Sequence, residues 1–138
     1  MRRRIASFVT VGVLTVLMAG TALAEGSWTS YIQGAWTGFE SRIWTDRNSD
    51  SPATVVRFER CHWHNSGASV NNVTVNLRRV ISLWPDENKG NKILYCSVAG
   101  SGNWGRVNAG DYRFKIVRIN GQTTTSQPLD VPYVRVSY

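Results

Sequence analysis

The chain has 138 residues, with 16 Lys and Arg against 9 Asp and Glu and a formal net charge of +7. A chain of this length forms one domain and is too short for a barrel enzyme or a doubly wound nucleotide-binding fold. The excess of cations is mild and spread along the sequence, whereas a nucleic-acid interface needs clustered cations, so no nucleic-acid partner is expected.

The first 24 residues have the composition of a secretory signal peptide. Arg2–Arg4 form a charged start, residues 5–17 are mostly apolar, and small residues stand two apart at Ala22 and Ala24. This order predicts cleavage after Ala24; an uncleaved N-terminal anchor is the alternative. Cleavage would leave 114 residues and, because three cations lie in the leader, a net charge of +4. We therefore expect a secreted, extracellular protein whose mature chain does not span a membrane.

Residues 25–38 form an aromatic stretch interrupted by glycines. Apolar residues recur there at helical spacing, but each glycine weakens a helix by about 0.5–1 kcal/mol relative to alanine. Its Trp and Thr residues suit an extended chain equally well. We expect residues 25–38 to form an N-terminal arm that precedes the regular domain, and residues 39–45 to form the first strand. The sequence does not decide between a helical and an extended conformation for the arm.

From residue 39 to residue 138 the sequence predicts one small antiparallel β-sandwich. Apolar β-branched or aromatic residues alternate with polar ones in several short segments, which is typical of strands. These segments are 56–59, 73–78, 112–116 and 131–138, and a further apolar run at 93–98 is expected to be covered on both faces. Turn-forming Asn, Gly, Ser and Pro lie at 65–67, 85–91, 100–103 and 120–121. The run at 109–116 resembles the entry to a late strand of immunoglobulin-like and fibronectin-like sandwiches, so we predict an all-β fold of that kind.

Two cysteines follow the leader, and an exported chain with an even count is expected to pair them. We predict a disulfide between Cys61 and Cys96, with Trp63 packed beside it; two free thiols for catalysis or metal binding are the alternative. His62 and His64 would point to the same side of a strand, as two ligands of a zinc or copper site would. No third ligand is indicated, so a solvent-exposed strand end is the favoured interpretation, and no cofactor or metal is expected.

Asp46, Asn48 and Asp50 place three oxygen ligands two residues apart, as calcium-binding loops do at their first positions. The rest of such a loop is missing, because Ser51 stands where the turn glycine belongs and Arg57 where the bidentate glutamate belongs. A polar turn capped by its own side chains is the favoured alternative.

Catalytic motifs are equally sparse. The sequence has no Gly-x-Ser-x-Gly motif and no serine linked by spacing to a histidine and an acid, so we expect the protein not to be an enzyme.

The aromatic content is the strongest departure from an ordinary small domain. The mature chain would keep all six Trp and, with five Tyr and the three Phe outside the leader, 14 aromatic residues in 114. Aromatic side chains on arms and beside turns are typical of binding surfaces, although they can also cap the open ends of a sandwich. The candidate binding residues are Trp28, Tyr31, Trp36, Trp84 and Trp104.

Three functions are compatible with these features. The first is a secreted protein-interaction module that docks through residues 25–38. A small exported chain with an aromatic N-terminal extension and a two-cysteine β domain is similar to the adaptor subunits of secreted umbrella-type toxin particles. That resemblance implies an extension inserted into a cleft of a scaffold protein and a body that holds a lectin-bearing subunit. The second is a carbohydrate or cell-wall binding module with Trp84 and Trp104 as stacking platforms, and the third is a small secreted enzyme or enzyme inhibitor.

Overall fold

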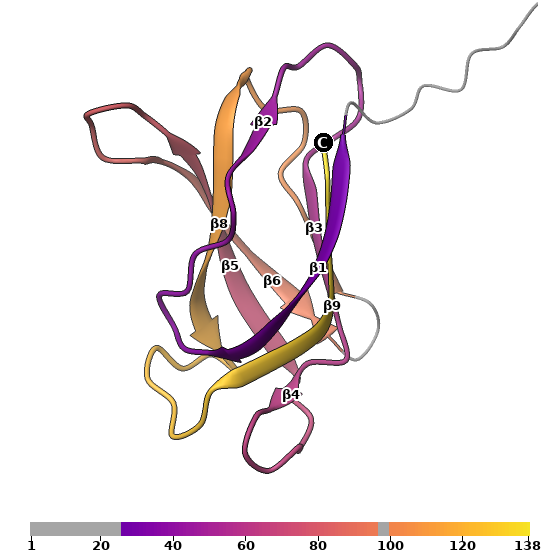
Figure 1. Cartoon of the computed structure of the whole chain (residues 1–138), viewed down its shortest axis with the longest axis vertical. Coiled ribbons are helices and arrows are strands. Elements are labelled where there is room, and N and C mark those ends of the chain that lie inside the picture. Colours follow the sequence, from indigo (N-terminus) through magenta and orange to yellow (C-terminus); the bar gives the residue numbers. More distant parts are fainter. Residues whose placement is uncertain (1–25, 97–99) are drawn as a thin grey trace, which may run out of the picture.

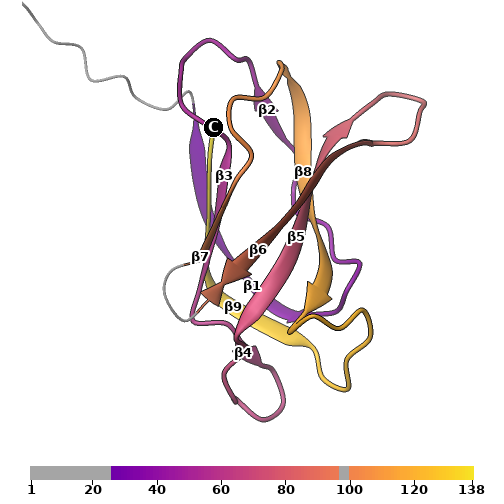
Figure 2. The same cartoon turned by 180° about the vertical axis from the view of Figure 1, so that it is seen from behind.

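The computed structural model describes residues 26–96 and 100–138, so the leader predicted over residues 1–24 lies outside the described part. Two antiparallel sheets pack face to face, which confirms the predicted all-β sandwich (Figures 1 and 2). One sheet has the strand order β1-β9-β3-β7, with β4 paired to β9, and the other has the order β2-β8-β5-β6. No described segment forms a helix of the length and apolarity that crossing a membrane requires.

The strand bounds define the elements used below. The five-stranded sheet contains β1 (Ser27–Ala35), β3 (Val55–Glu59), β4 (His62–Trp63), β7 (Gly100–Asn103) and β9 (Leu129–Ser137). The four-stranded sheet contains β2 (Trp44–Asp46), β5 (Asn72–Val80), β6 (Glu87–Tyr95) and β8 (Gly110–Ile119). In immunoglobulin sandwiches the last strand lies in the sheet of the strand before it. Here β9 lies instead between β1 and β3, and β2 occupies the position beside β8.

The core lies between the two sheets and follows the predicted alternation. Val56 and Phe58 of β3 and Phe114 and Ile116 of β8 are fully buried, while their polar neighbours face outward. Each such side chain contributes about 1.5–3 kcal/mol by leaving water. Tyr112 is also buried, and its hydroxyl donates a hydrogen bond of 2.6 Å to the carbonyl oxygen of Asn108. Burial raises the pKa of the Tyr112 phenol, which therefore remains a donor at neutral pH.

The predicted disulfide is confirmed and joins the two sheets. Cys61 follows β3 and Cys96 follows β6, their Cα atoms are 5.5 Å apart, and both side chains are buried. Trp63 is half-buried and packs against the same core. The expectation that the 93–98 run is covered on both faces was wrong, because Ile93 and Tyr95 are exposed and only alternate residues point inward; residues 97 and 98 lie outside the described part.

The described part of the predicted arm, residues 26–38, does not precede the domain as a separate segment. Most of them form β1, which pairs with β9 from Ser27 opposite Ser137 to Ala35 opposite Leu129. Ile32 and Ala35 are buried in the core. Register shifts on both sides of Ile32 interrupt the alternation of the strand, so its apolar residues do not show the period of two that indicates a strand.

The first predicted strand, residues 39–45, was also placed wrongly. The regular strand β2 covers only Trp44–Asp46. The preceding segment follows β8 irregularly, through bonds from Gly38 N to Ile116 O and from Ser41 N to Phe114 O, both within 3.0 Å. As a result Phe39 and Ile43 are exposed.

Two segments predicted as turns are strands. Most of 85–91 belongs to β6, where Asn88 and Asn91 both accept bonds of 2.7 Å from the buried Asn76 carboxamide. Residues 100–103 form β7, in which Gly100 and Gly102 face the core side. A Cβ at Gly100 would collide with the backbone of Tyr95, so the glycines there permit close packing rather than a turn. The Asn120–Gly121 turn is confirmed, with both residues at positive φ as a two-residue hairpin turn of type I′ requires.

Candidate functional site

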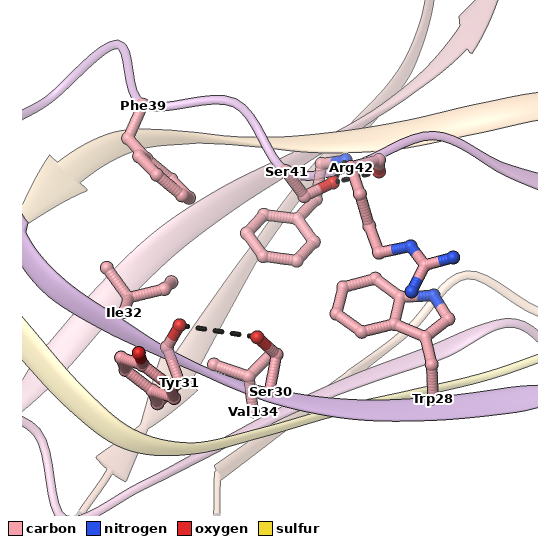
Figure 3. Close-up of a pocket in the computed structure, with 9 residues that line it drawn as sticks. Trp28, Ser30, Tyr31, Ile32, Phe39, Ser41, Arg42 and Val134 are labelled. Carbon is pink, nitrogen blue, oxygen red and sulfur yellow. Dashed lines mark hydrogen bonds between the residues drawn. The ribbon is translucent and has the colours of Figure 1, made fainter.

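The sandwich is open along the side where the outer strands of its two sheets face each other. On this side β1 borders the irregular segment 38–43, and a groove of about 110 Å³ lies between them (Figure 3). We call it the edge groove. It is lined by Trp28, Ser30, Tyr31, Ile32, Phe39, Ser41, Arg42, Phe114 and Val134.

The floor and one wall of the edge groove are parts of the core. Ile32, Phe114 and Val134 are buried residues. Trp28 stacks nearly parallel to Phe114, with ring centroids 6.4 Å apart, and the guanidinium of Arg42 lies 5.4 Å from the centroid of the Trp28 ring. Figure 3 shows Arg42 above that ring. A cation over an indole face is attracted by the ring quadrupole, so Trp28 is a fixed wall of the groove and not a free anchor.

The mouth of the groove and its surroundings expose large apolar side chains. Tyr31 is 68% exposed, Trp36 50%, Ile43 47% and Phe39 36%. Tyr31 and Phe39 stand at the groove (Figure 3), and Trp36 lies in the turn that joins them, where Phe39 N bonds to Trp36 O. We call these four residues the apolar rim. Tyr31 and Phe39 line the groove, and Trp36 and Ile43 lie in the same segment of the chain. Large exposed apolar side chains gathered in this way are typical of interaction sites.

The edge groove has binding features without catalytic ones. Among the described residues that line it, Arg42 is the only ionisable group apart from the exposed Tyr31 phenol. The hydroxyl of Ser41 accepts a bond from Phe114 N at 3.0 Å and donates one to Arg42 O at 2.8 Å. That hydroxyl therefore holds the segment in place, and it has no neighbouring base in the groove to activate it.

The predicted binding residues do not all meet. Trp28, Tyr31 and Trp36 lie together at or beside the edge groove. Trp84 is 75% exposed in the β5–β6 hairpin that projects from the body in Figure 1, next to Leu83, which is 99% exposed at a φ of 64°. Trp104 is half-buried, because its Nε1 donates a bond of 3.0 Å to Gly90 O and its ring packs over Gly102. The Trp104 ring is therefore not exposed as a stacking platform for a sugar.

Sequence reasoning missed most residues of this site, among them Phe39, Arg42 and Ile43. These three residues lie in the predicted strand 39–45, where an alternating pattern gives them no particular role. Their contribution depends on β1 lying beside segment 38–43, which is a tertiary contact that no local pattern reports.

The two histidines point to the same side, as expected, and meet one carboxylate. His64 Nδ1 lies 2.9 Å from Asp130 Oδ1, and His62 Nε2 lies 3.4 Å from Asp130 Oδ2. Asp130 also accepts a bond of 2.7 Å from Gly34 N of β1. Burial opposes ionisation of this carboxyl, but the Gly34 N–H and the imidazoles of His64 and His62 outweigh it and lower the pKa of Asp130. Through these contacts Asp130 of β9 links β4 and the residue that follows it to β1. No cluster suited to a metal ion occurs in the part of the chain that the structure describes.

The Asp46–Asp50 segment is a capped turn. The Asp46 carboxylate is buried and accepts bonds from Asn48 N at 2.8 Å and from Thr54 Oγ1 at 3.2 Å. Arg106 Nε donates to Asn48 Oδ1 at 2.6 Å. Because the side-chain oxygens of Asp46 and Asn48 already accept protein donors, one of them cationic, these contacts match the capped-turn alternative.

Comparisons with protein-family models, with curated proteins and with solved structures each gave no match. The chemistry of the site therefore rests on its own residues.

Proposed function

We propose that the protein is an exported, non-catalytic binding module that holds a protein partner at the edge groove and its apolar rim. The observation that carries this proposal is the exposure of four large apolar side chains in one segment at the open edge of the sandwich, two of which, Tyr31 and Phe39, line the groove. Aromatic side chains provide a large contact area with few rotatable bonds, and for that reason they dominate the energetics of protein interfaces.

The position of β1 supports a protein partner over a small ligand. The groove of about 110 Å³ is smaller than the roughly 300–1,000 Å³ that drug-sized ligands occupy. Because β1 is the outermost strand of its sheet, it also offers backbone groups to an added strand. A partner segment that pairs with β1 could place one side chain in the groove and cover Tyr31 and Phe39 with others.

Export and an adaptor role are parts of the same proposal. The predicted leader and the buried disulfide between Cys61 and Cys96 support an oxidising, extracellular location. An adaptor subunit of a secreted complex needs at least one such docking surface. Insertion of an N-terminal arm is no longer part of the proposal, because Ser27–Ala35 is built into the sheet. The docking surface is instead the edge that this strand forms.

The experiment compares two exposed aromatic surfaces of one molecule. The mature, disulfide-bonded chain is immobilised and incubated with the culture fluid of the organism that produces it. A Tyr31→Ser/Trp36→Ser variant should capture at least tenfold less of any partner, because rim residues of this type contribute about 2 kcal/mol or more each when they anchor an interface. Trp84→Ser is the matched control, since Trp84 is also exposed but lies outside the groove.

The thermal midpoints of all three proteins are measured in parallel. Both variants should unfold at the temperature of the wild type, because the side chains they remove are largely in solvent. Equal capture by the wild type and the rim variant, or an equal loss in the Trp84→Ser control, would contradict docking at the groove.

A further inference from the structure

A second cavity lies at the end of the sandwich where the β8–β9 connection meets β4. In Figures 1 and 2 this connection and β4 are at the same end of the molecule. The cavity has a volume of about 230 Å³ and shares no lining residue with the edge groove. Trp63 and the buried Ile119 form its apolar part, and Asn120, Gln122 and the run 124–126 form its polar part.

The Trp63 ring is a fixed surface. It is half-buried and packs against the core. The backbone N of Trp63 donates a bond of 2.8 Å to Ala68 O, and Trp63 lies opposite Leu129 in the pairing of β4 with β9. Its two neighbours in sequence, His62 and His64, are both held by Asp130. A ligand that stacks on this ring does not have to order it first, which removes one of the usual entropic costs of binding.

Hydrogen bonds hold two of the polar groups that line the cavity. Ile119 and Gln122 exchange backbone bonds of 3.0 and 2.9 Å around the type I′ turn. The Asn120 carboxamide is oriented by its Oδ1, which accepts bonds from Asn71 N at 2.9 Å and from Asn72 N at 3.1 Å. Thr125 Oγ1 donates to Gln127 O at 2.9 Å. The Asn120 carboxamide and the Thr125 hydroxyl are therefore held by the fold, while Gln122, Thr124 and Ser126 line the same cavity with exposed polar side chains.

We propose that this cavity is a binding subsite for one sugar unit of a neutral oligosaccharide. A pyranose ring has one face of C–H groups and a rim of hydroxyls. The negative face of an indole attracts the slightly positive C–H groups, and their contact removes apolar surface from water. Hydroxyl and carboxamide side chains can both donate and accept hydrogen bonds, as sugar hydroxyls do. Trp63 therefore matches the face of the sugar, and Asn120, Gln122 and residues 124–126 match its rim.

The composition of the cavity selects against other ligands. No charged side chain occurs among its described lining residues, so nothing there compensates the charge of an acidic sugar or a phosphate. An apolar peptide side chain would cover hydroxyl and amide groups without bonding to them, which costs about 1–3 kcal/mol for each group left unsatisfied. The volume is below that of a pocket for a drug-sized ligand, which fits a single ring whose chain continues into solvent.

This inference goes beyond the proposed function, and the two can fail separately. The test titrates the ¹⁵N-labelled mature, disulfide-bonded protein with cellohexaose, chitohexaose, xylohexaose, mannohexaose and maltohexaose, and with hyaluronan oligomers as the charged comparison. Indole N–H resonances are assigned with single Trp variants, so the response of Trp63 can be separated from those of the other five Trp. At least one neutral oligomer should shift the Trp63 indole and the amides of residues 120–126.

Variants decide whether the shift reports contact at this cavity. Trp63→Ala should weaken binding at least tenfold. Because Trp63 also packs on the core, Thr124→Val/Ser126→Ala provides a second variant that removes only hydroxyl groups and should weaken binding several-fold. Trp84→Ala and Tyr31→Ser/Trp36→Ser should bind the same oligomer as the wild type does. The proposal is overturned if no neutral oligomer shifts the Trp63 indole, if the shifts centre on Trp84 or the edge groove, or if hyaluronan binds more tightly than every neutral oligomer.

Discussion

The disulfide gives a stability prediction whose magnitude follows from the loop it closes. Cys61 and Cys96 are separated by 35 residues. The loss of chain entropy in the unfolded state then corresponds to about 4 kcal/mol at 25 °C. A domain of this size is stabilised by only about 5–15 kcal/mol in total. The double variant Cys61→Ala/Cys96→Ala should therefore lose a large share of its stability and melt roughly 15–20 °C lower.

Urea unfolding followed by Trp fluorescence measures this loss. The wild type is unfolded with and without reductant, and the double variant is unfolded beside it. Reduction leaves every side chain in place, so the reduced wild type controls for the two sulfur atoms that the variant lacks. The m-value should rise when the bridge is absent, because an unlinked chain exposes more surface on unfolding. A loss below about 1 kcal/mol with an unchanged m-value would show that the bridge does not act by restricting the unfolded chain.

Three further predictions concern single positions. Gly100→Ala should destabilise by about 3 kcal/mol in urea unfolding, because its Cβ would collide with the Tyr95 backbone. Gly102→Ala should also destabilise, but by less, because its Cβ would meet side-chain atoms of Trp104 and Lys92 and not backbone. Leu83→Asn should stabilise by up to about 1 kcal/mol, since Leu83 is almost fully exposed at positive φ; a loss of stability would contradict this. The lowered pKa of Asp130 means that its stabilisation is present above about pH 4 and is lost as the pH falls through that pKa. Asp130→Asn should therefore be less stable than the wild type at neutral pH and show a flatter decline in melting temperature below pH 4, and parallel declines would refute the assignment.

The parts of the fold that were predicted correctly are those in which local pattern and packing agree. Residues 56–59 and 112–116 alternate in sequence and have one face in the core, so a period of two indicated them directly. Cys61 and Cys96 could be paired because the predicted leader favours an oxidising location and two cysteines allow only one pairing. The type I′ turn at 120–121 was recognisable because Asn-Gly is the dipeptide that this backbone geometry favours.

The failures have equally specific causes. In β1 two register shifts displace Ile32 and Ala35 from the alternation, so a buried strand had the sequence of an irregular arm. In β7 Gly100 and Gly102 are required by close packing against Tyr95 and Trp104, yet two glycines in four residues are typical of a turn. The edge groove could not be foreseen, because it exists only where β1 and residues 38–43 are brought together around Phe114.

The distribution of the tryptophans changes what the aromatic excess means. Trp44 is buried, with ring centroids 6.3 Å from Tyr112 and 6.0 Å from Tyr138. Trp28, Trp63 and Trp104 are half-buried against the core. Most of the rings therefore stabilise a thin sandwich, and their number alone does not indicate a binding surface. The proposed docking surface rests on an exposed ring in the segment that borders the edge groove, Trp36, and the proposed sugar subsite rests on a packed ring beside polar side chains, Trp63. The two proposed sites share no lining residue. The Tyr31→Ser/Trp36→Ser variant should therefore lose the protein partner and keep the proposed sugar binding at Trp63.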